Sequence, residues 1–441
     1  MANDPVVIDK RPRSLVHMFL ARVEDTPDED AFYYPVDGGW QESTWAQTHE
    51  LVEGLAAGLL SLGIEVEDRV AILASTRFEW VLGHLATLWA GGAVTAVDPD
   101  ADDATIAAVL ADSRARVVIA EDYDAVRMLW RIRGRIRDVT KVVQIDGDYP
   151  DQRVLTLEGL LGLGSEHLAA HPRALSQRLY AVRRDGLAAL TYVDDLAGGL
   201  RGVRLSHAAR TYQATAVAML GQLTDADLAY LALPLRTAYA QSLLGVQLAC
   251  GFPIALEGRP DRAVESVALV RPTFIAATPG LLERIRAAIE EEHRPGLLRR
   301  QRTVDKLVRT DVRELFGDRL RFVLCGGGAL DTELLEFFEG AGVTVLEAYG
   351  RAEAGGAVSI ALPEDAGSRT AGRPLPGTDV RISGDGEIQV ASPGVMDGYH
   401  GRRGDSEAVL DQGWLSTGDA GVLDEEGRVR VLGGYVARHG E

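Results

Sequence analysis

Short apolar runs alternate with helix-length stretches in the first part of the chain. Residues 50–63 (ELVEGLAAGLLSLG) carry apolar side chains at helical spacing and end in glycine, which predicts an amphipathic helix. The runs at 69–73 and 93–97 are short, apolar and partly β-branched, which is typical of buried strands, and helix-length stretches separate them. This alternation predicts βαβ units and therefore a parallel sheet.

A second series of apolar runs begins near residue 186 and predicts a second α/β lobe. Its runs lie at 186–192, 228–233, 273–276, 322–324 and 344–346. From about residue 367 the chain changes to short strands with close Gly/Asp turns, which indicates a small β-rich lobe. We expect one large domain over 1–432, with lobes of roughly 1–185, 186–350 and 351–432, and a short remaining segment at 433–441.

Charge and cysteine content argue against several classes of function. The 441 residues carry a formal net charge of −19, which disfavours non-specific binding to nucleic acid or to anionic lipid. The two cysteines, Cys250 and Cys325, stand in apolar or Gly-rich runs, so a reducing compartment fits better than a disulfide framework. The N-terminus lacks the apolar core of a signal peptide, and no apolar stretch is long enough to span a bilayer. We therefore predict a cytoplasmic protein with no nucleic-acid partner and no transmembrane segment.

Motifs along nearly the whole chain follow the order of one known family. They include EDRVAIL, FEWVLGHLATLWAGGAVTAVDP, PTFIAATPG, RFVLCGGGAL, LEAYGRAE, GRPLPG and WLSTGDAGVL. The chain thus resembles the acyl-adenylate-forming superfamily (AMP-dependent synthetases and ligases), and is most similar to bacterial long-chain fatty acyl-CoA synthetases. The resemblance implies an α/β fold, the large N-terminal domain of these enzymes, with two α/β lobes of mostly parallel sheets and a small distorted β-barrel lobe. For an active member it implies ATP or AMP and Mg²⁺ as cofactors.

The resemblance also implies site residues, several of which keep their chemistry. Glu353 would hold Mg²⁺ and is the catalytic candidate if the protein is active, and Asp419 would accept hydrogen bonds from the ribose hydroxyls. The remaining nucleotide-binding positions are Gly198, Arg201, Gly326, Gly327, Gly328, Ala348 and Tyr349. In the acyl pocket, Thr237 stands where the family has a gating histidine, and Tyr239 keeps an aromatic ring. The alternative for the retained residues is purely structural, because glycines, buried tyrosines and turn aspartates also maintain a fold.

The loop that would cradle the ATP phosphates departs from the family pattern. Its Ser, Thr and Gly positions are occupied by Val193, Asp194, Asp195, Leu196 and Ala197, and Arg201 stands where a lysine is usual. A carboxylate about 4 Å from a phosphate oxygen costs on the order of 4 kcal/mol at an effective dielectric constant of about 20. One alternative is a solvated turn with no ligand role. Another is that the two aspartates join Glu353 and Asp419 in a carboxylate cluster for Mg²⁺ or Ca²⁺.

Two further departures concern phosphate chemistry. Ala352 replaces a threonine that contacts phosphate in the family, and Arg351 replaces the usual leucine before it. No lysine follows Lys306, so we expect the small C-terminal domain and its catalytic lysine to be absent. We predict a degenerate acyl-CoA synthetase-like protein that cannot form acyl-adenylates and acts as a binding module for a fatty acid or acyl ligand, or for a protein partner in regulation. The alternative is the large domain of an ATP-dependent fatty acid–CoA/AMP ligase that works with a C-terminal domain supplied elsewhere.

Overall fold

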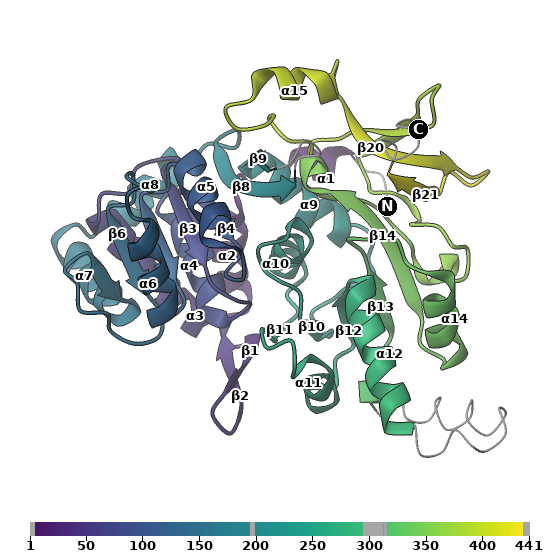
Figure 1. Cartoon of the computed structure of the whole chain (residues 1–441), viewed down its shortest axis with the longest axis horizontal. Helices are drawn as coiled ribbons and strands as arrows, with labels where there is room; N and C mark the ends of the chain where they lie inside the picture. The colour runs from purple at the N-terminus through teal and green to yellow at the C-terminus, as the bar shows by residue number, and fades with distance from the viewer. Residues whose placement is uncertain (1–4, 195–198, 294–311, 313–314, 435–441) are drawn as a thin grey trace.

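The computed structural model describes residues 5–194, 199–293, 312 and 315–434. Three sheets organise these residues, and the small C-terminal sheet lies at the top of Figure 1, above the two larger ones. Within the described ranges, none of the helices combines the length and the apolar character needed to cross a bilayer.

The first sheet has seven strands in the order β7-β6-β5-β3-β4-β8-β9. All neighbours are parallel except β8 and β9, which form an antiparallel hairpin. The strands are β3 (Arg69–Leu73), β4 (Ala93–Val97), β5 (Val117–Ala120), β6 (Lys141–Gln144), β7 (Val154–Thr156), β8 (Leu187–Asp194) and β9 (Leu200–Ser206). The helix α3 (Trp45–Ser61) precedes these strands in the chain, and the helices between them are α4 (Phe78–Trp89), α5 (Asp103–Ser113), α6 (Tyr123–Ile132), α7 (Leu157–Ala170) and α8 (Ala174–Ala181).

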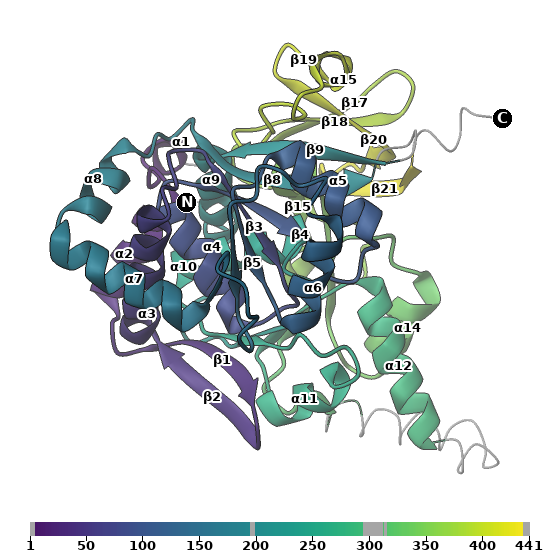
Figure 2. The same cartoon turned by 60° about the vertical axis from the view of Figure 1, so that its left-hand side comes forward.

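Helices cover both faces of this sheet, with α5 and α6 on one side and α3 and α7 on the other (Figure 2). Side chains alternate between the faces of a strand. Accordingly, Val70 and Ile72 of β3 pack in one hydrophobic core, and Ala71 and Leu73 pack in another. A run that is apolar at every position is therefore what a strand buried on both faces requires.

The second sheet has nine strands in the order β16-β15-β14-β13-β12-β10-β11-β1-β2. Its strands are β1 (Asp30–Val36), β2 (Gly39–Thr44), β10 (Ala229–Leu231), β11 (Ile254–Leu256), β12 (Phe274–Ala277), β13 (Phe322–Cys325), β14 (Val345–Arg351), β15 (Gly356–Ile360) and β16 (Arg373–Pro374). The central pairs from β14 to β1 are parallel. The accompanying helices are α9 (His207–Ala218), α10 (Ala238–Cys250), α11 (Ala263–Val270), α12 (Pro279–His293) and α14 (Thr332–Gly340), preceded in the chain by α1 (Pro5–Asp9) and α2 (Leu15–Asp25).

The third sheet is small and antiparallel. It contains β17 (Asp379–Ile382), β18 (Glu387–Ala391), β19 (Leu410–Asp411), β20 (Trp414–Leu423) and β21 (Val429–Gly434), with α15 (Arg403–Val409) beside it. Two 3₁₀ turns, η2 (Ala352–Ala354) and η3 (Pro363–Asp365), follow β14 and β15. The predicted fold class, with two mostly parallel sheets and a small β lobe, is confirmed.

Two details differ from the sequence-based expectation. The run at 186–192 was expected to open the second α/β series, but its strand β8 pairs with β4 of the first sheet, with Val94 opposite Ala189. Conversely, β1 and β2 precede the first sheet in the chain yet join the second, because Phe32 of β1 pairs with Ile254 of β11. The order of the apolar runs along the chain predicts where the strands lie in the sequence, but not which sheet each strand joins. The predicted helix at 50–63 corresponds to α3, which begins at Trp45, because Thr44 and Gln47 form a capping box there.

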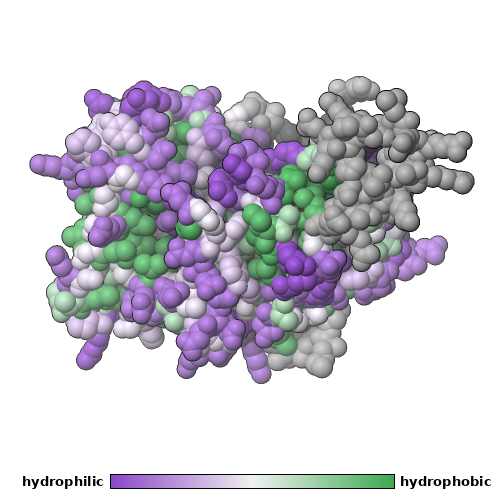
Figure 3. Space-filling model, turned by 90° about the horizontal axis from the view of Figure 1, so that it is seen from below, coloured by the Kyte–Doolittle hydropathy of each residue, from purple (hydrophilic) through white to green (hydrophobic). Residues whose placement is uncertain are grey.

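Hydrophobic residues also reach the surface. The face seen from below carries hydrophobic areas interrupted by hydrophilic residues (Figure 3). Among the described residues, the most exposed large apolar side chains are Tyr180 at 84% and Leu269 at 67%, on α8 and α11. Isolated apolar residues of this kind are ordinary on globular domains and indicate no particular partner.

Candidate nucleotide and acyl site

The carboxyl end of β14 brings the predicted nucleotide residues against the third sheet. The Tyr349 hydroxyl donates a hydrogen bond to Oδ2 of Asp419 on β20, at 2.8 Å. Burial, followed by the nearby Asp419 charge, raises the pKa of Tyr349 far above its usual value, so the phenol keeps its proton and remains a donor. The structure therefore brings together two positions, 70 residues apart, that the sequence predicts in one site.

Arg351 lies between two carboxylates of this corner. Its Nε is 3.6 Å from Oε2 of Glu353 in η2, and its Nη1 is 3.6 Å from Oδ1 of Asp419. Burial lowers the Arg351 pKa, but Glu353 and Asp419 more than offset that effect and the net shift is upward. One guanidinium thus serves as the counter-charge for both acids.

Glu353 has a second partner from the segment that follows the third-sheet strand β18. The hydroxyl of Tyr399 donates to Oε1 of Glu353 at 3.1 Å. Burial and then Glu353 raise the pKa of Tyr399 to about 12. The Glu353 side chain is only 8% exposed, and the main chain of η2 is also held, because Met396 N donates to the Glu353 carbonyl. The predicted magnesium ligand is therefore a buried carboxylate with fixed orientation.

Asp419 and Glu353 can bind the ribose and the Mg²⁺ that the resemblance implies, provided that Arg351 gives way to the metal. Each carboxylate oxygen has two lone pairs, so Asp419 can still accept from ribose hydroxyls while it binds Tyr349. Mg²⁺ at Glu353 would have to compete with the Arg351 guanidinium. The two 3.6 Å separations are longer than hydrogen bonds, and the Arg351 side chain is 39% exposed, so rotation away from the carboxylates is sterically open.

The glycine-rich exit of β13 adjoins the start of α10. A Cβ atom on Gly326 would lie 3.3 Å from the Ala348 carbonyl oxygen and 3.6 Å from the ring of Tyr239. The Tyr239 hydroxyl donates to the Leu324 carbonyl at 2.7 Å. Gly327 has a φ of +77°, in the left-handed region that favours glycine, and Gly328 follows it on the exposed loop. The predicted adenine-slot and acyl-pocket residues thus meet at one place, and close packing explains the glycine at 326.

Thr237, at the predicted gate position, has a structural role in this arrangement. It is the N-cap of α10, where its hydroxyl accepts from Ala240 N at 3.3 Å and donates to the Pro234 carbonyl at 2.9 Å. A threonine at an N-cap satisfies an otherwise unpaired helix N–H. Capping therefore accounts for this residue without any contact to a ligand.

The predicted phosphate loop joins the antiparallel strands β8 and β9. Val193 pairs with Arg201 and Asp194 pairs with Leu200, which leaves Asp194 exposed at the hairpin end. The predicted residues Asp195, Leu196, Ala197 and Gly198 lie outside the described residues. Among the residues that the structure describes, no three His, Cys, Asp or Glu side chains lie close enough to share a metal ion. The proposed four-carboxylate cluster therefore has no support from its described members.

Tyr399 connects this hairpin to the Glu353 corner. The Arg201 guanidinium lies over the Tyr399 ring, 5.2 Å from its centroid, while the Tyr399 hydroxyl binds Glu353. His400 N also donates to the Gly202 carbonyl at 2.7 Å. The sequence analysis did not predict Tyr399 as a site residue, and it described Arg351 only as a departure from the family pattern. The Gly398-Tyr399 pair in the sequence was the available signal for Tyr399, whereas the pairing of Arg351 depends on the close approach of β14 to β20.

Comparisons with known proteins agree with this architecture. A long-chain-fatty-acid–CoA ligase of Mycobacterium bovis, FadD15, is 28% identical over 94% of this chain and 73% of that ligase. The N-terminal domain of FACL13 from Mycobacterium tuberculosis, solved with an inhibitor, has a TM-score of 0.75 at 20% identity, over 96% of this chain and 99% of that one. O-succinylbenzoate CoA synthetase from Bacillus subtilis, solved in complex with AMP, has a TM-score of 0.73 at 22% identity, over 95% and 78% of the two chains.

These similarities confirm the resemblance to long-chain fatty acyl-CoA synthetases and the large-domain architecture. At such identities the solved structures show the fold alone. The sequence itself gives the family, because a sequence model described as AMP-binding enzyme matches residues 19–400. That match includes both large sheets and the corner formed by Tyr349, Glu353 and Tyr399, and the chain therefore belongs to the AMP-binding enzyme family.

Proposed function

We propose that this chain is the large domain of an ATP-dependent fatty acid–CoA ligase, which forms an acyl-adenylate together with a small C-terminal domain. The main support is the fixed pair of Asp419 and Tyr349 beside the Gly326 strand exit. There a carboxylate that can accept from ribose hydroxyls is bonded to Tyr349, next to Ala348, whose carbonyl packs closely against Gly326. The relatives named as long-chain-fatty-acid–CoA ligases suggest a fatty acid as the acyl substrate.

A second function is favoured by a different observation. Arg351 faces both Glu353 and Asp419, and the phosphate loop begins with the exposed Asp194. These features disfavour a polyanion with its Mg²⁺, and they support a module that binds an acyl ligand or a protein partner without adenylation.

Exchange of pyrophosphate into ATP distinguishes the two functions. The assay uses this chain with palmitate and Mg²⁺, with and without the isolated small domain of a related ligase added in trans. We expect exchange when both parts are present, and at least a tenfold loss in Asp419→Asn, which keeps the size of the side chain and removes its charge. Asp138→Ser, an exposed aspartate beyond α6, is the control and should match the wild type. Exchange no greater than in a heat-inactivated sample would favour the binding module.

A further inference from the structure

Two histidine side chains meet at the C-terminal end of α7. His167 lies in the last turn of this helix and His171 is its C-cap. The ring centres are 5.0 Å apart, and the ring planes are inclined by 58°. His171 N donates to the His167 carbonyl at 2.8 Å, so the spacing of one helical turn is kept at the cap. Because residues four apart are neighbours on a helix surface, the two imidazoles lie on the same side of α7.

This ring separation matches the one that a shared metal ion would impose. Zinc binds imidazole nitrogens at about 2.0 Å in tetrahedral geometry, which places two ring centres about 5 Å apart. Histidines at positions i and i+4 also provide two zinc ligands in the helical H-E-x-x-H motif. The sequence here is HLAAH, without the glutamate that serves as general base in that motif. The spacing therefore indicates metal binding and gives no support for hydrolysis.

The pair is open to an ion from solvent. His171 is exposed and His167 is half-buried. Within the described ranges, no third His, Cys, Asp or Glu side chain lies close enough to share a metal ion with them. Water would complete the coordination, as it does in zinc sites that keep an open position.

The end of α7 is an electrostatically favourable place for a cation. The last carbonyl groups of a helix carry the negative end of its dipole. The exposed Glu166 adds a negative charge beside the pair, and the exposed Arg173, two residues beyond His171, opposes it. The formal net charge of the whole chain is −19. The nearby side-chain charges thus cancel, and the helix dipole and the net charge both favour a cation.

Close packing of α7 on α3 fixes the support of the pair. A Cβ atom on Gly164 of α7 would collide with the Gly54 carbonyl oxygen of α3, and one on Gly58 would collide with the Leu160 carbonyl oxygen. Such a close approach of two helices requires glycine. Ligands on packed helices are held more precisely than ligands on loops. The spacing of the two imidazoles is therefore largely set before a metal ion binds.

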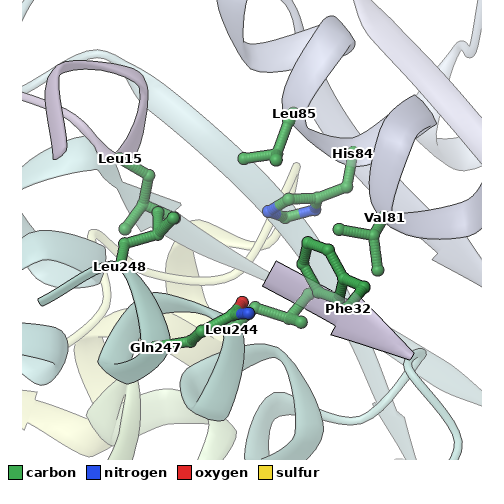
Figure 4. Close-up of a pocket in the computed structure, with 8 residues that line it drawn as sticks. All are labelled: Leu15, Phe32, Val81, His84, Leu85, Leu244, Gln247 and Leu248. Atoms are coloured by element: carbon green, nitrogen blue, oxygen red, sulfur yellow. The ribbon is translucent and has the colours of Figure 1, made fainter. Parts of the chain in front are cut away.

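The buried His84 on α4 offers no comparable site. Its imidazole borders a cavity together with Leu15, Phe32 and Gln247 (Figure 4). The volume of about 10 Å³ leaves room for about one water molecule. None of the other lining residues is a His, Cys, Asp or Glu. A second strong metal ligand is thus present at His167 and lacking at His84.

We propose that His167 and His171 form a binding site for a divalent transition-metal ion, with Zn²⁺ as its probe. One nitrogen of each imidazole would bind the ion. Imidazole ligands suit zinc, copper and nickel, whereas Mg²⁺ and Ca²⁺ prefer oxygen ligands. The site is separate from the Glu353 corner, because α7 lies at the left end of the molecule in Figure 1 and β14 and β20 lie to the right. The inference does not depend on ligase activity, so either proposal can fail while the other stands.

Calorimetric titration of the full chain with zinc chloride tests the site, at pH 7 in a buffer that does not bind metal. We expect one equivalent of zinc to bind, and an excess of Mg²⁺ to leave its affinity unchanged. Two imidazoles on one helix act as linked ligands, so losing either should weaken zinc binding at least tenfold. His167→Gln and His171→Gln test this, since glutamine is compatible with the helix.

A matched variant separates this site from other imidazoles of the chain. Glu166→His combined with His167→Glu keeps the number of histidines and the net charge, but moves one imidazole to another side of α7. It should lose the affinity as the single variants do. Glu166→Gln alone is the control and should keep the wild-type affinity within threefold. Thermal unfolding without metal checks that each variant is folded.

Each result decides for or against the pair. Losses of at least tenfold in His167→Gln, His171→Gln and the exchanged variant, with zinc binding kept in Glu166→Gln, support the site. A smaller loss in any of the three, no zinc binding in the wild type, or displacement of zinc by Mg²⁺ would overturn it. Should a variant fail to fold, modification of the wild type with diethyl pyrocarbonate localises the ion. Zinc should then protect His167 and His171, and equal modification with and without zinc would contradict the proposal.

Discussion

Two arginines, Arg351 and Arg210, are placed in opposite electrostatic settings. Arg351 is 39% exposed in its side chain and lies 3.6 Å from two carboxylates, which together raise its pKa despite burial. Arg210 is 3% exposed, has no acceptor at its terminal nitrogens among the described residues, and has a lowered pKa. The described residues place two carboxylates beside the arginine that water can partly reach and no acceptor at the terminal nitrogens of the one that it cannot.

The difference shows how each region depends on its arginine. At the Arg351 corner one guanidinium faces two carboxylates, so an incoming Mg²⁺ must displace it from Glu353 before the metal can bind. The terminal nitrogens of Arg210 have no acceptor among the described residues, so its burial is costly. Removing the guanidinium should therefore destabilise the first region and stabilise the second.

The largest expected effect is a loss of stability in acid, caused by the buried histidines His84 and His207. His84 and His207 have folded pKa values of about 3 and about 4, below the unfolded value near 6.5. The unfolded chain therefore binds protons first as the pH falls, and stability present above pH 6.5 is lost below it. Between pH 7 and 5 each histidine should cost about 2 kcal/mol, or about 4 kcal/mol together. Urea unfolding at pH 7, 6 and 5 measures this loss.

His84→Phe provides the matched comparison, because phenylalanine can keep the stack on Trp80 but does not titrate. The stability loss of this variant between pH 7 and 5 should be about 2 kcal/mol smaller than that of the wild type. Equal losses in both proteins would mean that His84 is protonated in the folded state and that its surroundings are more hydrated than its burial indicates.

The second prediction exchanges each arginine for methionine. Arg210→Met should raise the free energy of unfolding by about 2 kcal/mol, because an unpaired buried charge is replaced by an apolar side chain of similar volume. Arg351→Met should lower it by about 1 kcal/mol, because Glu353 is left buried without its cation. Guanidinium denaturation of both variants at pH 7 checks the opposite signs. Shifts of the same sign would remove the contrast between the two regions.

The sequence predicted more of the fold than of the site, for a physical reason. Short runs rich in apolar and β-branched residues, such as Arg69–Leu73, favour buried strands, and the structure places β3 and β4 at the predicted residues. The sheet to which β8 and β1 belong depends on pairing between distant segments, which local patterns do not encode. The contacts of Asp419 with Tyr349 and Arg351 arise in the same way, from the approach of β20 to β14.

The burial of Arg210 could not be predicted from the sequence either. A single arginine in the helix at 207–218 reads as a surface residue, since arginines are seldom buried without a partner. Only the packing of α9 against α10, where a Cβ on Gly245 would lie 3.3 Å from Ala214, shows that this helix is covered. The role of the predicted site residues in binding or catalysis stays a prediction, because their positions alone do not test it.

The smallest expected effect concerns nucleotide affinity at the Arg351 corner. If the guanidinium competes with Mg²⁺ for Glu353, Arg351→Leu should tighten the binding of Mg·ATP by about threefold, which corresponds to about 0.7 kcal/mol. Calorimetry with Mg²⁺ and with EDTA separates the two contributions, because the gain should appear only when the metal is present. The control Arg381→Leu removes an arginine that stacks on Trp414 of the same small sheet and touches neither carboxylate. Weaker binding in Arg351→Leu would reverse the interpretation, since the guanidinium would then contact phosphate in place of the hydroxyl that Ala352 lacks. The corner would in that case be a rebuilt phosphate site, with Arg351 as its anion ligand.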